Sequence, residues 1–106
     1  MDSKKIERGF KGVWIPAGIY LSEDLSLAEK VLLAEIDSLD GEEGCFARNE
    51  HFSNFLKLGK TRVSQMISSL KEKGYVFIKY TYKDNSKEIK KRIIKVNKNK
   101  FYNAEK

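Results

Sequence analysis

Residues 49–74 carry the pattern that most constrains the fold of this chain, because two short amphipathic segments are separated there by only a few residues. In the second segment the apolar side chains recur at i, i+3, i+4 and i+7: Val63, Met66, Ile67 and Leu70. This spacing predicts a helix with one buried stripe, beginning near Lys60 or Thr61 and ending at Gly74. The first segment predicts a shorter helix with Asn49 as its N-cap and an apolar face of Phe52, Phe55 and Leu56.

The turn between the two predicted helices departs from the common helix-turn-helix pattern. Many such units place glycine at the first turn position, where the backbone is left-handed, but this chain has Lys57 there and Gly59 two residues later. Either Lys57 adopts a positive φ, at a cost of about 1 kcal/mol, or the turn is longer. Ser53 is small enough for the helices to approach closely, and Leu58 is expected to pack into the core between them. The pair predicts a helix-turn-helix whose second helix enters a DNA major groove.

The segments before this unit predict further elements. Residues 26–39 favour a helix, since Ser26 and Glu29 have the spacing of a capping box. Its expected apolar face, with Glu29 lying off it, is Leu27, Val31, Leu32, Ile36 and Leu39. Pro16 is expected to end a short strand at residues 13–15, and four nearby side chains are expected to be buried: Trp14, Ile15, Ile19 and Tyr20. Residues 45–47 favour a short extended strand.

After Gly74 the periodicity changes from helical to alternating. Residues 75–82 and 89–96 are rich in β-branched and aromatic residues and flank a polar turn, which predicts a β-hairpin with a lysine-rich tip. The predicted fold class is therefore α+β, mainly α: a winged helix-turn-helix of three helices with a C-terminal β-hairpin wing. We expect a flexible arm at residues 1–11, the winged-helix domain at 12–96, and a polar tail or the start of a linker at 97–106.

Charge is distributed unevenly along the chain, whose net charge is +6. Residues 21–43 hold eight acids and one base, whereas residues 44–106 hold sixteen bases and five acids. A basic region of this size favours a polyanion such as nucleic acid, although a solvated lysine-rich surface has the same composition. There is no apolar run of the ~20 residues that span a bilayer, and the N-terminus lacks the apolar core of a secretory signal. With Cys45 as the one cysteine, we expect a cytoplasmic protein without membrane partners.

These expectations define a candidate surface for double-stranded DNA. On the recognition helix the expected contact residues are Lys60, Thr61, Arg62, Ser64, Gln65, Ser68 and Lys71. On the wing they are Lys83, Asn85, Lys87, Lys90, Lys91 and Arg92. Asn49, as a helix cap, is expected to lie near a phosphate.

Other chemistries lack the residue patterns that they need. His51 has no second histidine for a metal site, and Cys45 has no base at a useful spacing, so we expect a surface histidine and a buried thiol. The string at Gly59, Lys60 and Thr61 lacks the upstream glycine of a phosphate-binding loop, because position 54 is asparagine. We therefore expect no enzymatic activity, cofactor, metal ion or small-molecule ligand.

The string GCFARNEHFSNFLKLGKTRVSQMISSLKEKGYV, preceded by IPAGIY and LSLAEKVLLAEIDSL, resembles the winged-helix N-terminal domain of replication initiators and replisome organisers. These proteins occur in phages and mobile elements of Gram-positive bacteria and are often joined to DnaD-like C-terminal regions. The resemblance covers about residues 10–96. It implies origin binding at the start of replication, with other replication proteins as partners. It also implies recognition residues at Lys60, Thr61, Arg62, Ser64, Gln65 and Ser68.

Other functions and partners stay open at this point. A transcriptional repressor would use the same groove contacts as a replication initiator. A protein-interaction module would instead use the acidic first helix or the segment around Trp14, without binding DNA. RNA is the least favoured partner, because no aromatic sheet motif stands out and a helix fits A-form RNA poorly. A homodimer is a further expectation, with the apolar N-terminal segment as its interface, since one recognition helix contacts few base pairs.

Overall fold

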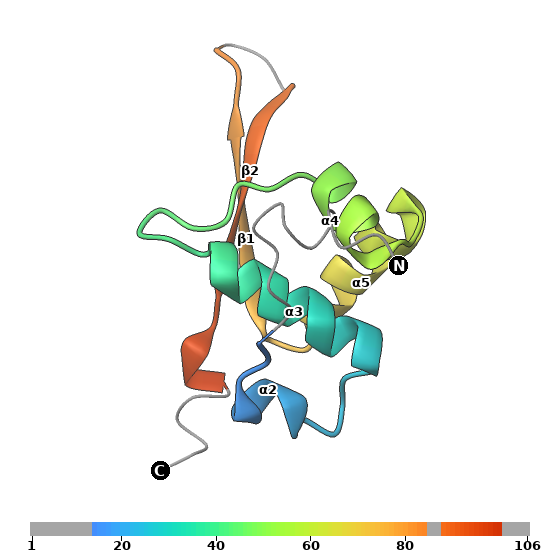
Figure 1. Ribbon diagram of the computed structural model, residues 1–106. Helices are drawn as coiled ribbons and strands as arrows, with labels where there is room; N and C mark the ends of the chain where they lie inside the picture. The colour runs from blue at the N-terminus through green and yellow to red at the C-terminus, as the bar shows by residue number, and fades with distance from the viewer. Residues whose placement is uncertain (1–13, 85–87, 101–106) are drawn as a thin grey trace.

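The computed structural model describes residues 14–84 and 88–100, and expectations for residues 1–13, 85–87 and 101–106 fall outside this part of the chain. The elements, in order, are α2 (Ala17–Tyr20), α3 (Leu27–Leu39), α4 (Asn49–Leu56), α5 (Lys60–Glu72), β1 (Val76–Tyr82), β2 (Ile89–Val96) and the 3-10 helix η1 (Lys98–Lys100) (Figure 1). The two strands form an antiparallel hairpin, and the predicted α+β class is confirmed.

The described residues contain four α-helices, whereas the sequence predicted three. The additional helix is α2, a single turn that follows Pro16 directly. Proline lacks an N–H, but a backbone donor at a helix start has no partner within the helix in any case, so Pro16 begins this turn at little cost. Residues 14–16 form no strand, which contradicts the predicted strand ended by Pro16.

The predicted burial of the segment around α2 is right for the isoleucines and wrong for the aromatic residues. Ile19 is fully buried, and Ile15 packs against the core from a partly buried position. Trp14 is 76% exposed and Tyr20 is 55% exposed. A helical turn places successive side chains about 100° apart, so Ile19 and Tyr20 cannot both face α3.

Helix α3 begins with the predicted capping box. The Ser26 hydroxyl accepts a hydrogen bond from the Glu29 N–H at 3.2 Å, and the Glu29 carboxylate accepts one from the Ser26 N–H at 2.9 Å. The buried face differs from the predicted one, because α2 packs against α3 in addition to α4, α5 and β2. It comprises Glu29, Leu32, Leu33, Ala34 and Ile36. Leu27 is 66% exposed and Leu39 is 41% exposed, and Glu29 turns inward to contact Lys73 Nζ at 3.3 Å.

The turn between α4 and α5 is tight, and Lys57 has a left-handed backbone with φ 62° and ψ 38°. Of the two possibilities predicted for this turn, the positive φ is therefore the correct one. The Leu58 N–H donates to the Ser53 carbonyl at 3.2 Å, and the Ser53 hydroxyl donates to the Leu58 carbonyl. Leu58 packs against the core as predicted. Gly59 has an ordinary φ of −67° at the N-cap of α5.

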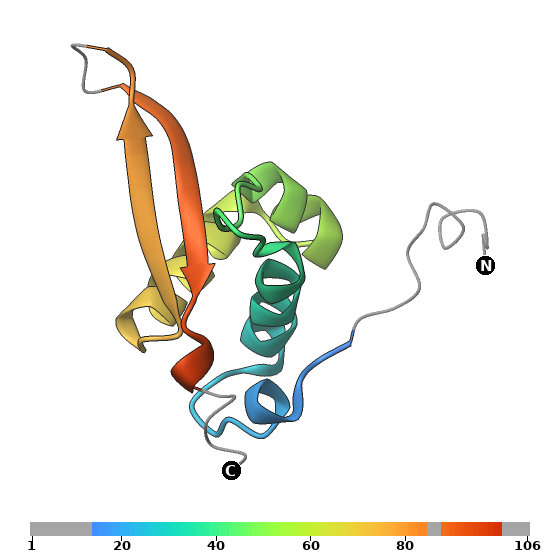
Figure 2. The ribbon, with the colours of Figure 1, turned by 90° about the vertical axis from the view of Figure 1, so that its left-hand side faces the viewer.

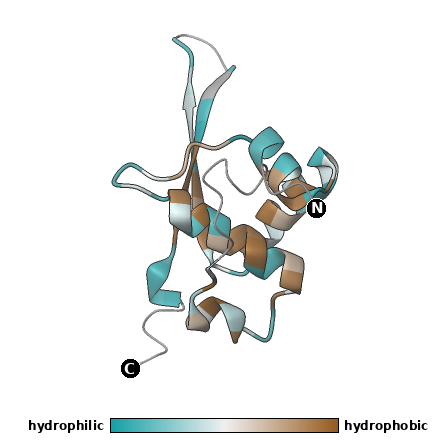
Figure 3. Cartoon of the chain, viewed as in Figure 1, coloured by the Kyte–Doolittle hydropathy of each residue, from teal (hydrophilic) through white to brown (hydrophobic). Residues whose placement is uncertain are grey.

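The hairpin joins the helices through one face of its base. Four side chains on this face pack into the core: Val76, Ile78, Ile94 and Val96. At the outer edge of β2, Cys45 forms a single antiparallel bridge with Ile94, with N···O distances of 2.8 and 2.9 Å. The Cys45 thiol is buried as predicted, and this burial raises its pKa. The far end of the hairpin extends beyond the helices (Figure 2) and is mostly hydrophilic, in contrast to its base and to α3 (Figure 3).

Gly44 lies where the chain needs a residue without a side chain. Its φ is 108°, and a Cβ there would lie 2.5 Å from Cγ2 of Ile93. Because backbone strain and steric overlap add, we expect Gly44→Ala to lower the free energy of unfolding by about 2–4 kcal/mol. Gly41, in the same turn, has no atoms within 4 Å of such a Cβ, so Gly41→Ala should change it by less than about 0.5 kcal/mol. Urea unfolding followed by circular dichroism measures both, and equal losses would contradict this account of the turn.

Candidate nucleic-acid interface

The polar face of α5 is exposed because the opposite stripe is buried. Val63, Met66, Ile67 and Leu70 are all buried, as their spacing predicted. Seven side chains predicted as contacts on this helix are all exposed: Lys60, Thr61, Arg62, Ser64, Gln65, Ser68 and Lys71. The structure therefore brings the predicted recognition residues together on one accessible helix. Among them are three cations, and the same surface also carries one exposed acid, Glu72, so its net charge is positive and favours a negatively charged ligand.

Two residues of this face also line a hollow beside the start of α3. The hollow has a volume of about 310 Å³, and its lining residues are Ser26, Glu29, Arg62, Gln65, Met66 and Ser69. Burial disfavours the charged form of Glu29, but hydrogen bonds from the Ser26 N–H, Ser69 and Lys73 outweigh it and lower the pKa of this carboxyl. Glu29, in the first turn of α3, is thus a carboxylate that links the start of α3 to the end of α5.

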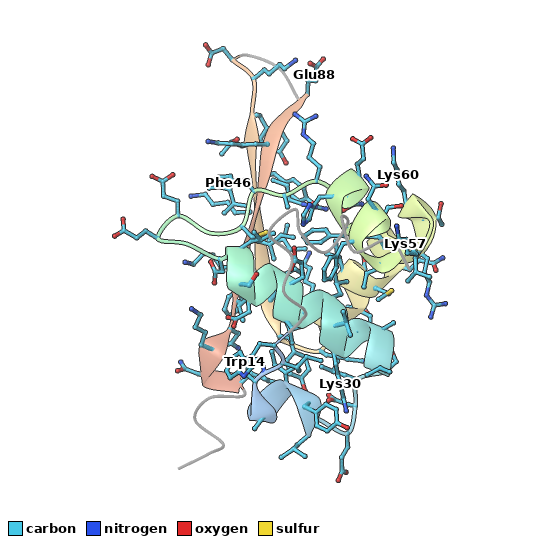
Figure 4. All side chains as sticks on the ribbon, viewed as in Figure 1. Trp14, Lys30, Phe46, Lys57, Lys60 and Glu88 are labelled. Carbon is cyan, nitrogen blue, oxygen red and sulfur yellow. The ribbon has the colours of Figure 1, made fainter. Side chains whose placement is uncertain are left out.

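Lys57 adds an exposed cation that the predicted contact set did not include. It lies in the turn before α5, at the same end of the domain as Lys60 (Figure 4). Lys57 occupies a left-handed position that glycine would adopt without strain. The presence of lysine there is the feature of the sequence that could have indicated a contact residue. Arg48 is a second exposed cation outside the predicted set, at the N-cap of α4.

The predicted wing residues occupy different environments. Lys83 forms an ion pair with Glu88 at the tip of the hairpin. Lys91 is exposed, and its Nζ lies 4.9 Å from the centroid of the Phe46 ring. Asn85 and Lys87 lie outside the described residues, and the backbone of Lys90 lies in β2.

Arg92 links the hairpin to the start of α4. Its Nη1 donates to Asn49 Oδ1 at 2.7 Å, and its Nη2 donates to the Ala47 carbonyl at 2.9 Å. Burial lowers the pKa of the Arg92 guanidinium. The prediction that Asn49 caps α4 is wrong: Arg48 is the N-cap residue, without a side-chain cap bond, and the Asn49 side chain accepts from Arg92 instead. Charge-assisted bonds of this kind are stronger than neutral ones, so Arg92 holds the hairpin against the helices.

A basic pocket lies in the fork between β2 and the loop before α4. Its volume is about 590 Å³, and its lining residues are Phe46, Ala47, Arg48, Asn49, Lys91 and Arg92. We call it the fork pocket. Three of these six side chains are cationic, and two belong to the predicted wing, so the pocket is suited to an anionic group.

Other features of the described residues bear on the chemistries that the sequence disfavours. His51 is about half exposed, as predicted for a surface histidine, and its Nε2 lies 2.8 Å from Glu35 Oε2. In the described part of the chain, no group of three or more His, Cys, Asp or Glu side chains is placed to hold a metal ion. Over these same residues, no helix has the length and apolar character to cross a membrane.

Comparisons with models of protein families, with curated proteins and with solved structures find no match to this chain. The resemblance to replication initiators therefore stays a prediction.

The bond between Arg92 and Asn49 can be measured by a double-mutant cycle. We expect a coupling free energy of about 1–2 kcal/mol between Arg92→Ala and Asn49→Ala, because the bond joins a charged donor to a partly buried acceptor. Lys91→Ala, the exposed neighbour, should change the free energy of unfolding by less than about 0.5 kcal/mol. Urea unfolding of the single and double variants gives these values. Additive losses would contradict a direct bond in solution.

Proposed function

We propose that this chain is a winged-helix protein that binds double-stranded DNA sequence-specifically, with α5 as its recognition helix and the hairpin as its wing. The observation behind the proposal is the exposure of all seven predicted contact residues of α5, which occupy the half of the helix surface that the buried stripe leaves free. An α-helix fits a major groove that is about 12 Å wide. Arginine and glutamine are the side chains that bond guanine and adenine edges in pairs, so Arg62 and Gln65 are assigned to base contacts.

The order of the elements supports the winged-helix assignment. Helix α3 is followed by an extended residue, Cys45, that pairs with β2, then by α4, a tight turn, α5 and the hairpin. In this arrangement α3, α4 and the base of the hairpin pack against α5, and the hairpin extends beyond the helices (Figure 1). The wing can then reach the DNA backbone next to the groove that α5 occupies.

Cations around α5 and on the hairpin are assigned to phosphates. On the helical side they are Lys57, Lys60 and Lys71, and on the wing they are Lys87, Lys90 and Lys91, with Asn85 as a neutral contact. Lys83, also predicted as a contact, is paired with Glu88 and is not among them. Arg92 has a different role in this proposal, since its guanidinium bonds Asn49 and Ala47 and sets the position of the wing. Phosphate contacts of this kind make affinity fall steeply with salt.

The resemblance to replication initiators favours a role at the origin of a phage or mobile element, in the cytoplasm, with other replication proteins as partners. On this proposal the chain acts by binding, without catalysis or a cofactor. A transcriptional regulator with the same DNA contacts is the alternative, because both roles need the same surface. Selection of bound duplexes from a random pool, followed by mapping of the selected sequence to an origin or a promoter, separates the two.

The exposed apolar residues near α2 favour a second candidate function, a protein–protein contact without DNA. Trp14, Leu21 and Leu27 are 76%, 70% and 66% exposed, respectively. A homodimer or a replication partner would cover such residues. If this contact were the whole function, the chain would show no salt-sensitive affinity for DNA.

Arg62→Ala tests the recognition-helix assignment. We expect it to weaken binding to the selected duplex by about 1–3 kcal/mol, with a smaller effect on unrelated duplexes, because it removes paired bonds to one base. Glu50→Ala is the control, since it removes an exposed charge on α4 that the proposal does not use. Fluorescence anisotropy with labelled duplexes measures both. If Arg62→Ala kept both affinity and sequence preference, α5 would not be the recognition helix.

A further inference from the structure

The solvent side of the hairpin has an unusual composition. Antiparallel sheets with one buried face normally direct polar side chains toward solvent. Here Phe77 on β1 is 58% exposed and Phe46, beside β2, is 41% exposed. The core face of the hairpin base is already occupied by other side chains, so these two rings are not needed there. An exposed aromatic pair on a rigid sheet is a candidate contact surface.

The strand register places lysines between these rings. Phe77 pairs with Lys95, Lys79 with Ile93, and Thr81 with Lys91. Paired residues point to the same side of a sheet, as do residues two apart on one strand, so these six share the side opposite the core face. We call this the outer sheet face.

Phe46 extends the outer sheet face across β2. Its neighbour Cys45 bridges Ile94, which places Phe46 beside Ile93. Lys91 Nζ lies 4.9 Å from the Phe46 ring centroid, and Phe46 lies beside the hairpin in Figure 4. The ammonium group of Lys91 thus lies over one side of the Phe46 ring, and the charged side chains of the face are Lys79, Lys91 and Lys95.

This combination selects one kind of ligand. Three lysines, one of which is paired with an acid, favour a polyanion, and exposed rings favour flat apolar groups that can stack on them. Single-stranded nucleic acid offers both, whereas a duplex hides the faces of its bases in the stack. Lys95 Nζ lies 3.4 Å from Asp40 Oδ1, so Lys79 and Lys91 are the cations assigned to phosphates.

The fork pocket continues this surface around the edge of β2. Phe46 and Lys91 belong both to the outer sheet face and to the pocket lining. The pocket volume, about 590 Å³, lies within the range of small-ligand sites, roughly 300–1,000 Å³, and is sufficient for a nucleotide. In the opposite direction, beyond Lys95, the neighbouring loop carries Glu42 and Glu43. Because these acids repel phosphates, a nucleic-acid strand that crosses the face is directed from Phe77 toward the fork pocket.

We propose that the outer sheet face binds single-stranded DNA, with unpaired bases stacked on Phe77 and Phe46 and phosphates paired with Lys79 and Lys91. The choice of DNA rests on the proposed function, since a duplex-binding protein meets single strands wherever its duplex opens. The outer sheet face lies on the other side of the hairpin from the core-facing residues, so it leaves α5 accessible to a duplex, and Lys91 is the side chain that both proposed surfaces use.

Fluorescence anisotropy of a labelled oligo-dT of about 12 nucleotides, which cannot pair with itself, tests the proposal on the full chain. Phe77→Ala is expected to weaken binding about tenfold, and Phe77→Trp, which keeps a flat ring, should stay within about threefold of the wild type. Tyr82→Ala is the matched control and should change affinity less than about twofold. Tyr82 is 54% exposed on the same strand, five residues from Phe77 and thus on the other side of the sheet.

Circular dichroism verifies that each variant is folded, and Phe77→Leu, which keeps an apolar side chain without a ring, replaces Phe77→Ala if that variant unfolds. Unchanged affinity in the ring-less variant, or an equal loss in Tyr82→Ala, would overturn the proposal. Tighter binding of oligo-rU with the same dependence on Phe77 would overturn the choice of DNA. A wild-type chain that binds a duplex but not oligo-dT contradicts this inference alone, and one that binds oligo-dT but no duplex contradicts the proposed function alone.

Discussion

Burial of one stripe of α5 is the interaction on which the rest of the structure depends. The stripe comprises Val63, Met66, Ile67 and Leu70, and it packs in a core that also receives α3, α4 and the base of the hairpin. Full burial of one such side chain contributes about 1.5–3 kcal/mol, so the stripe outweighs the roughly 1 kcal/mol needed to hold Lys57 in a left-handed turn. Because a helix has 3.6 residues per turn, this burial also determines which residues of α5 face outward.

Separate contacts hold the hairpin against the loop before α4, and this loop borders both the wing and the outer sheet face. The Cys45–Ile94 bridge and the bonds from Arg92 to Asn49 and Ala47 join β2 to the loop before α4. Phe46 lies between these links, so the loop that anchors the hairpin also contributes to the outer sheet face and to the fork pocket. A change in this loop would therefore act on the position of the wing and on the outer sheet face together.

Local patterns were sufficient to predict most of the elements, because their causes lie within a few residues. The capping box at Ser26, the stripe of α5 and the alternation of the strands are of this kind. Features that depend on distant partners were not predictable. The Asn49 side chain bonds Arg92, 43 residues away, instead of capping its own helix. The helical turn of α2 directs Tyr20 away from the core, and alternation alone could not show which side of the hairpin would face the core.

The central claim is that α5 and the hairpin form one duplex-binding unit. Backbone amide chemical-shift mapping by NMR, during titration with a selected duplex of about 20 base pairs, tests it most directly. We expect the largest shifts in α5, between Lys60 and Ser68, and along the hairpin, with few around α2. Shifts confined to α2 and the segment around Trp14, or no shifts at low salt, would contradict it.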